Sequence, residues 1–179
     1  VGSEMCIRDS PAVHYLPTAL TFATQPGGAA LGAVLTAQPV VHVMGENNEI
    51  ATQYNGPVTL AIGTNPGSGE LAGTLTVDAV AGVATFDGLA VTLDGGSGFT
   101  LTATVGSLVG ESDPFDILNP APSLTAMSPI WKPAGSAGFE LTLDGESFVA
   151  SSVVRWSGVA KTPTSFGATQ LKAVSYTHL

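Results

Sequence analysis

The chain has 179 residues, of which 44% are hydrophobic and only 11% are charged. Its 14 acidic and 5 basic residues give a net charge of −9, and such a surface repels the phosphates of nucleic acid. No apolar run approaches the roughly 18 residues that a membrane helix needs, so we expect neither nucleic-acid binding nor a membrane span.

The two ends of the chain differ in kind from the sequence between them. Residues 1–10 and 174–179 closely resemble translated sequencing adapter, so we expect neither end to be native. We expect residues 1–10 to be disordered and residues 11–17 to be a lead-in to the first module. Cys6 falls in the first of these strings, so the interior offers neither a disulfide nor a cysteine metal site. If the parent protein is exported, its signal lies upstream.

Between the ends, apolar residues alternate with small polar residues at period two, which is typical of β-strands. In chain order, the expected strands of the first part are residues 20–22, 40–43, 58–62, 75–77, 82–86, 99–105 and 114–117. Clusters of Gly, Pro and Asn between them are typical of turns. This spacing of strands and turns predicts an all-β chain built of β-sandwiches.

The segment Phe99–Val105 has the clearest alternation in the chain. Successive side chains of a strand point to opposite faces, so one set belongs in the core and the other in water. We expect Phe99, Leu101 and Ala103 to face the core and Thr100, Thr102 and Thr104 to face water.

Three strings in the first part are similar to those of a known family. They are Pro57–Val77, Gly82–Leu89 and Gly98–Thr104, and they resemble the bacterial immunoglobulin-like repeats of large surface and secreted proteins. The resemblance covers about residues 18–118 and implies one immunoglobulin-like sandwich. In such repeats the turn matching Gly45–Glu49 usually contains Asp and a Gly-Asn pair, and this chain departs from that pattern.

A second module is expected to follow a short joint. Residues 119–121 lie between Leu118 and Pro122, and the prolines there discourage continuous strand pairing, which predicts a linker. Beyond it, four motifs in order resemble the start of an IPT/TIG domain, which is another immunoglobulin-like fold. The resemblance covers about residues 122–173, and the motifs are residues 122–129, 138–148, 152–158 and 168–171. The strands that complete such a sandwich are missing, so the second module is expected to be incomplete.

That incompleteness predicts uncovered apolar side chains. Five are expected to face an absent sheet: Phe139, Leu141, Leu143, Phe148 and Trp156. Each large side chain left in water forfeits about 1.5 to 3 kcal/mol, so the second module is expected to be marginal, and only the first to unfold cooperatively. Trp156 alternates with Val154 and is also expected to pack inward, with Arg155 pointing out.

Few residues suggest a ligand, and none suggests catalysis. Glu46, Asn47, Asn48 and Glu49 offer hard oxygen ligands for Ca²⁺, although a solvated turn explains the same composition. Asp94–Gly98 raises the same question, and its glycines are explained by tight backbone turns. Trp131, beside two prolines, is a candidate for stacking on a sugar. We expect no catalytic residue and no cofactor.

The sequence therefore favours a non-catalytic spacer or adhesion module from a large bacterial exported or cell-surface protein. Its expected partners are neighbouring immunoglobulin-like modules of the same parent chain and an extracellular protein or glycan ligand. The alternative is an accessory region of a secreted polysaccharide-active enzyme. A third interpretation, an independent sugar-binding domain, needs an exposed aromatic pair that the sequence does not supply.

Overall fold

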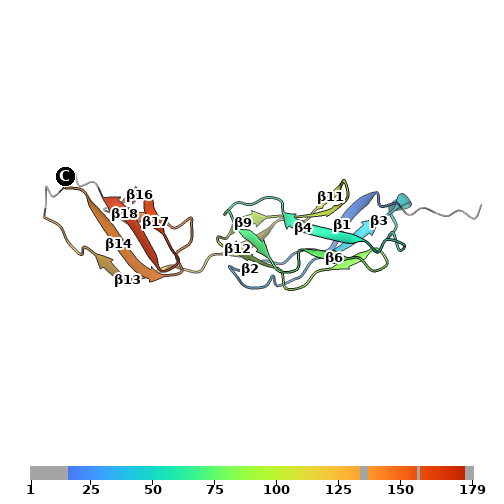
Figure 1. Ribbon diagram of the computed structural model, residues 1–179, viewed down its shortest axis with the longest axis horizontal. Coiled ribbons are helices and arrows are strands. Elements are labelled where there is room, and N and C mark those ends of the chain that lie inside the picture. The colour runs from blue at the N-terminus through green and yellow to red at the C-terminus, as the bar shows by residue number, and fades with distance from the viewer. Residues whose placement is uncertain (1–15, 134–136, 157, 176–179) are drawn as a thin grey trace, which may run out of the picture.

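The computed structural model describes residues 16–133, 137–156 and 158–175, and this part of the chain is all-β apart from one short 3-10 helix. The strands form two modules that lie end to end and are joined by a short segment after Leu118 (Figure 1). Each module encloses a hydrophobic core of its own, and the two cores share no residue. The expected all-β sandwich class is confirmed.

The first module contains twelve strands and the 3-10 helix η1. They are β1 (Ala19–Thr24), β2 (Ala29–Ala30), β3 (Val40–Met44), η1 (Glu46–Asn48), β4 (Pro57–Ile62), β5 (Glu70–Ala72), β6 (Thr76–Asp78), β7 (Val83–Thr85), β8 (Ala90–Thr92), β9 (Gly96–Phe99), β10 (Leu101–Val105), β11 (Leu108–Glu111) and β12 (Phe115–Leu118). Six of the seven expected strands are confirmed to within one or two residues, and the seventh, residues 99–105, is divided. The sequence missed β2, β5, β8 and β11, which are short or lack large alternating side chains.

These strands hydrogen-bond in small sheets, with the orders β1-β3-β7, β11-β10-β4-β6, β2-β12-β9 and β5-β8. All pairs are antiparallel except β2 with β12, which run parallel. Nineteen buried residues, from most of these strands and from the loops between them, form one continuous core. Phe86 and Phe99 are among its largest side chains, and the Phe99 ring lies 6.1 Å from that of Phe115.

The segment expected to be one strand from Phe99 to Val105 is divided between two sheets. Residues of β9 pair with β12, whereas those of β10 pair with β4 and β11. Phe99, Leu101 and Ala103 are fully buried as predicted, but the expectation that Thr100 faces water is wrong, because it is 8% exposed. Thr100 lies at the division, where its hydroxyl donates to Glu111 Oε1 at 2.8 Å and accepts from the Thr64 amide at 2.8 Å.

The second module contains β13 (Ser123–Ser128), β14 (Phe139–Glu146), β15 (Val154–Trp156), β16 (Val159–Lys161), β17 (Pro163–Phe166) and β18 (Gln170–Ser175). Four of them form an antiparallel sheet in the order β13-β14-β18-β17, and β15 pairs with β16. Strand β18 includes Val174 and Ser175, which pair with Glu140 and Phe139 of β14. Two residues of the tail assigned to adapter therefore take part in the sheet, and residues 1–10 and 176–179 lie outside the described residues.

The expected exposure of the apolar face of this sheet is wrong in large part. Leu141 is 2% exposed and Phe148 is 7% exposed, and Phe139, Leu143 and Trp156 are half-buried. The physical reason is that β15 contributes its buried Val154 to the same core as the sheet residues. As predicted, Trp156 packs against this core and Arg155 is exposed.

Candidate functional site

The turn proposed for Ca²⁺ lies at one end of the first module. Its residues Glu46 to Asn48 form η1, and the Gly45 amide donates to the Glu49 carbonyl at 2.8 Å. Glu46, Asn48 and Glu49 are exposed, and Asn48 has a φ of 61°, in the left-handed region that Asn tolerates. The side chain of Asn47 lies outside the described residues. In the described ranges no three His, Cys, Asp or Glu side chains gather in a way that could hold a metal ion.

The tryptophan proposed for sugar contact is exposed. Trp131 follows β13 and is 69% exposed, and its neighbour Ile130 is 74% exposed. The other tryptophan, Trp156, is half-buried and makes an edge contact with Phe139, with 5.9 Å between the ring centroids. Of the two tryptophans, only Trp131 presents most of its surface to solvent.

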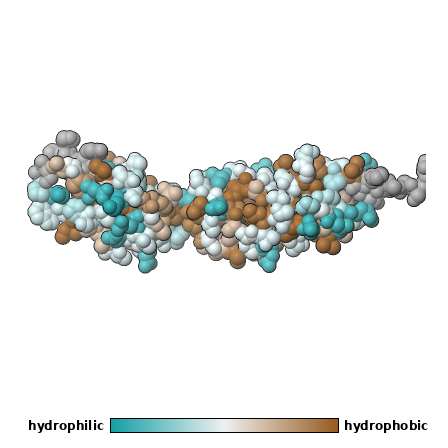
Figure 2. All heavy atoms as spheres, viewed as in Figure 1, coloured by the Kyte–Doolittle hydropathy of each residue, from teal (hydrophilic) through white to brown (hydrophobic). Residues whose placement is uncertain are grey.

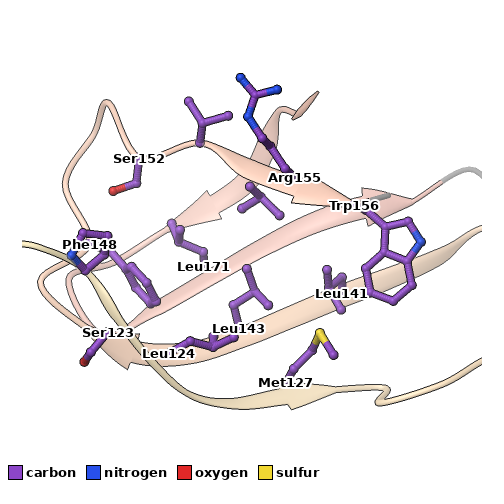
Figure 3. A pocket seen from close by; sticks show the side chains of 13 residues that line it. Ser123, Leu124, Met127, Leu141, Leu143, Phe148, Ser152, Arg155, Trp156 and Leu171 are labelled. Atoms are coloured by element: carbon purple, nitrogen blue, oxygen red, sulfur yellow. The ribbon is translucent and has the colours of Figure 1, made fainter. Parts of the chain in front are cut away.

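An apolar groove of about 290 Å³ opens in the second module, between β13 and β14 on one side and β15 on the other (Figure 3). Figure 3 shows Leu143, Leu141 and Leu171 on its floor and Met127 and Leu124 along one wall. The remaining lining residues are Pro122, Ser123, Phe148, Ser152, Val153, Val154, Arg155 and Trp156. The groove is therefore suited to an apolar occupant.

The main chain on both sides of this groove has hydrogen-bonding capacity left. Among the described strands, β13 pairs only with β14 and β15 pairs only with β16. Each of these strands therefore has one edge that no described strand covers, and such an edge can accept an extended segment. An apolar groove beside free strand edges fits a β-strand better than a compact polar ligand.

A second site lies where the modules meet, and its central residue is Asp94. Asp94 is 2% exposed, which is rare for an acidic residue. It follows β8 in a tight turn, in which the Asp94 amide donates to the Thr92 carbonyl at 3.0 Å. The residue between them, Leu93, has a φ of 71° and is 64% exposed. A three-residue turn with a bulky residue at positive φ is strained, so the packing around it must hold it in place.

Four hydrogen bonds converge on the Asp94 carboxylate, and they come from three parts of the chain. Oδ1 accepts from the Gly95 amide at 2.9 Å, from Asn119 Nδ2 at 2.7 Å and from Ser151 Oγ at 3.1 Å. Oδ2 accepts from the Ser151 amide at 2.9 Å. The Gly95 amide also donates to Asn119 Oδ1 at 2.7 Å. The first module, the linker and the second module therefore meet at one carboxylate.

The close approach at this site depends on Gly95. A Cβ atom at this position would lie 2.4 Å from the Ile117 carbonyl oxygen and 2.8 Å from Asn119 Oδ1. Because both neighbours belong to β12 and the residue after it, any side chain here would push the turn away from the linker. The interpretation of the glycines of Asp94–Gly98 as turn residues is wrong in large part, because the tight turn spans Thr92 to Asp94 and Gly96 and Gly98 lie in β9, where only Gly98 has a positive φ. The sequence also did not reveal the role of Asp94.

Comparison with protein-family models, with curated proteins and with solved structures returns no match for this chain. Within the described residues, no helix has the length and apolar character needed to cross a membrane.

Proposed function

We propose that this chain is part of a spacer or adhesion region of a large bacterial exported or cell-surface protein, built from tandem immunoglobulin-like modules. The observation that carries the proposal is the end-to-end arrangement of two modules with separate cores (Figure 1). Each additional module of this kind adds length without enlarging a shared core. The function is then to hold a distal domain away from the surface that anchors the protein.

The strand orders support the immunoglobulin-like assignment. In that fold, one sheet has the order A-B-E-D and the other contains C, F and G. The order β13-β14-β18-β17 corresponds to A-B-E-D, with β15 and β16 as C and C′. In the first module, β4, β10 and β11 are neighbours in the order C, F and G. The free edge of β15 is where strand F of the second module would pair.

The surface chemistry supports an exported spacer as well. With a net charge of −9 and few charged residues, the chain relies on Thr, Ser and Gly for its solvent-facing positions. Figure 2 shows hydrophilic and apolar residues mixed over the visible face of both modules. A net negative charge limits association between neighbouring copies.

The proposal is tested by sequencing the source DNA through both ends of this reading frame. Further sandwich modules together with an export signal support the spacer. A catalytic domain beside these modules supports the accessory region of a secreted enzyme instead. An intracellular protein without repeats contradicts both.

A second measurement tests the shape in solution. A compact chain of 179 residues has a radius of gyration of about 16 Å. Two modules in line must exceed this value, and their small-angle X-ray scattering should give a distance distribution with a shoulder at the separation of the modules. A single symmetric peak with a radius near about 16 Å would contradict end-to-end spacing.

One observation favours a contribution from sugar binding. The indole of Trp131 is 69% exposed, as a stacking platform requires. If it binds a glycan, soluble polysaccharides should change the tryptophan fluorescence of the chain, and Trp131→Ala should abolish that change. Trp156→Phe is the matched control, because Trp156 packs against Phe139 and the core.

A further inference from the structure

We infer that Asp94 is the clamp that fixes the orientation of the second module relative to the first, through its hydrogen bonds to Ser151 and Asn119. The inference deepens the proposed spacer function and rests on it for its biological purpose, because a spacer needs joints that do not bend freely. The clamp consists of the Asp94 carboxylate and the four groups that donate hydrogen bonds to it.

The hydrogen bonds between the modules all end on this carboxylate, as far as the described residues go. Both come from Ser151, whose amide reaches Oδ2 at 2.9 Å and whose hydroxyl reaches Oδ1 at 3.1 Å. Two bonds from one residue to the two oxygens of one carboxylate restrict rotation as well as separation. A single bond would allow the second module to turn about it.

Each partner in the clamp is anchored close to a core. Asp94 comes three residues after Val91, which is fully buried, and Asn119 comes two residues after Ile117, which is 2% exposed. The two sides are further joined by the bond from Asn119 Nδ2 to Asp94. The first module therefore presents the carboxylate on a rigid support.

The loop that carries Ser151 is braced in the same way. The Ser152 amide donates to the Val149 carbonyl at 2.8 Å, and the Val149 amide donates to Ser152 Oγ at 2.9 Å. Phe148, one residue earlier, is 7% exposed and belongs to the core of the second module. Movement of Ser151 is therefore coupled to movement of the whole module.

Both oxygens of the Asp94 carboxylate are in use while the clamp is closed. Oδ1 accepts three hydrogen bonds and Oδ2 accepts one, so replacing either oxygen with an NH2 group removes at least one of them. Asparagine has the same shape as aspartate but carries an NH2 group in place of one oxygen. That NH2 group would face N–H and O–H groups that are themselves hydrogen-bond donors. Asp94→Asn should therefore open the clamp without changing the volume at the site.

The test measures the distance distribution between two spin labels by pulsed electron paramagnetic resonance. The labels are placed on exposed positions in different modules, through Val109→Cys, 65% exposed, and Val159→Cys, 57% exposed, with the one native cysteine removed by Cys6→Ser. Domains joined by a linker move unless their interface holds them, so Asp94→Asn should widen the distribution at least about twofold.

Asp87→Asn provides the matched control. Asp87 also precedes a glycine and accepts from its amide, with 2.8 Å between Gly88 N and Oδ1, but it is exposed and has no bond to the second module. The control should keep the width of the unsubstituted chain. If Asp94→Asn prevents folding, Ser151→Ala decides, because it removes one bond from the other side and leaves the first module intact.

The possible outcomes distinguish a failure of the clamp from a failure of the spacer function. A narrow distribution that Asp94→Asn or, failing that, Ser151→Ala broadens supports the clamp. A narrow distribution that neither variant broadens overturns the clamp and leaves a rigid spacer. A broad distribution in the unsubstituted chain overturns both the clamp and rigid spacing.

Discussion

Phe99→Ala tests whether the two modules are independent units of stability. The side chain of Phe99 is fully buried, and its ring packs against that of Phe115 at 6.1 Å. Removing a buried phenyl ring costs about 3 to 5 kcal/mol, because the transfer free energy is lost and a cavity remains. In a module of this size each kcal/mol lowers the melting temperature by about 4 °C or more, so we expect a fall of roughly 12 °C or more.

The companion variant is Leu141→Ala, in the second core. Leu141 is 2% exposed, but its core has only five buried residues against nineteen in the first. Because the cores share no residue, the melting temperature of the first module should stay within about 1 °C. Differential scanning calorimetry on the full chain measures both variants, and we expect one main transition, from the first module.

Two results would refute this reasoning. If Leu141→Ala lowers the main transition as much as Phe99→Ala does, the modules unfold as one unit and their cores are coupled. If the unsubstituted chain shows two well-separated cooperative transitions, the second module is stable by itself and is not marginal.

Two further substitutions probe the hydrogen bonds of single side-chain hydroxyls by urea denaturation. Tyr54→Phe removes the bond from the phenol to the Pro57 carbonyl at 2.8 Å, and we expect a loss of about 0.5 to 1 kcal/mol, whereas no change would show that water replaces it. Burial, followed by the charge of Asp78, raises the pKa of Tyr54, so the folded state holds this proton more tightly than the unfolded chain does. The contribution of Tyr54 to the free energy of unfolding should be fully present below about pH 10. It should decline above that pH, because Tyr54 ionises in the unfolded chain before it ionises in the folded one. Tyr54→Phe should remove this contribution to the loss of stability at high pH. Thr100→Val keeps the shape but removes both hydrogen bonds of the hydroxyl, to Glu111 Oε1 and from the Thr64 amide, each at 2.8 Å. Because Glu111 and Thr64 are exposed and can bond to water instead, we expect a loss of about 0.5 to 1.5 kcal/mol, and an unchanged midpoint would refute the role of that hydroxyl.

The strands of the first module could be predicted from alternation because their inward side chains are large and their outward ones small. The division between β9 and β10 could not. It depends on Thr100, whose hydroxyl is held by Glu111 in β11, and no local pattern marks a threonine that is buried with a partner. The strand β2 has only two residues, Ala29 and Ala30, and carries no periodicity at all.

The two sites differ in how far the sequence could reveal them. Trp131 could be picked out because an aromatic residue between prolines stands apart from its surroundings, and it is exposed. Asp94 could not, because an aspartate before two glycines is typical of a solvated turn. Its partners Asn119 and Ser151 lie 25 and 57 positions later in the chain, so only the fold brings them together.

The parallel pairing of β2 with β12 determines how the first module bears tension. Ala29 lies opposite Ile117 and Ala30 opposite Leu118, and the Leu31 amide donates to the Leu118 carbonyl at 2.9 Å. A force that pulls the module by its two ends reaches β2 through β1 and acts on β12 directly. Because β2 and β12 run parallel, this force loads their hydrogen bonds in shear, so that they rupture together rather than in succession. Resistance to forced unfolding depends on the unfolding rate and not on equilibrium stability. A module with this pairing can therefore withstand brief mechanical loads even when its thermodynamic stability is modest.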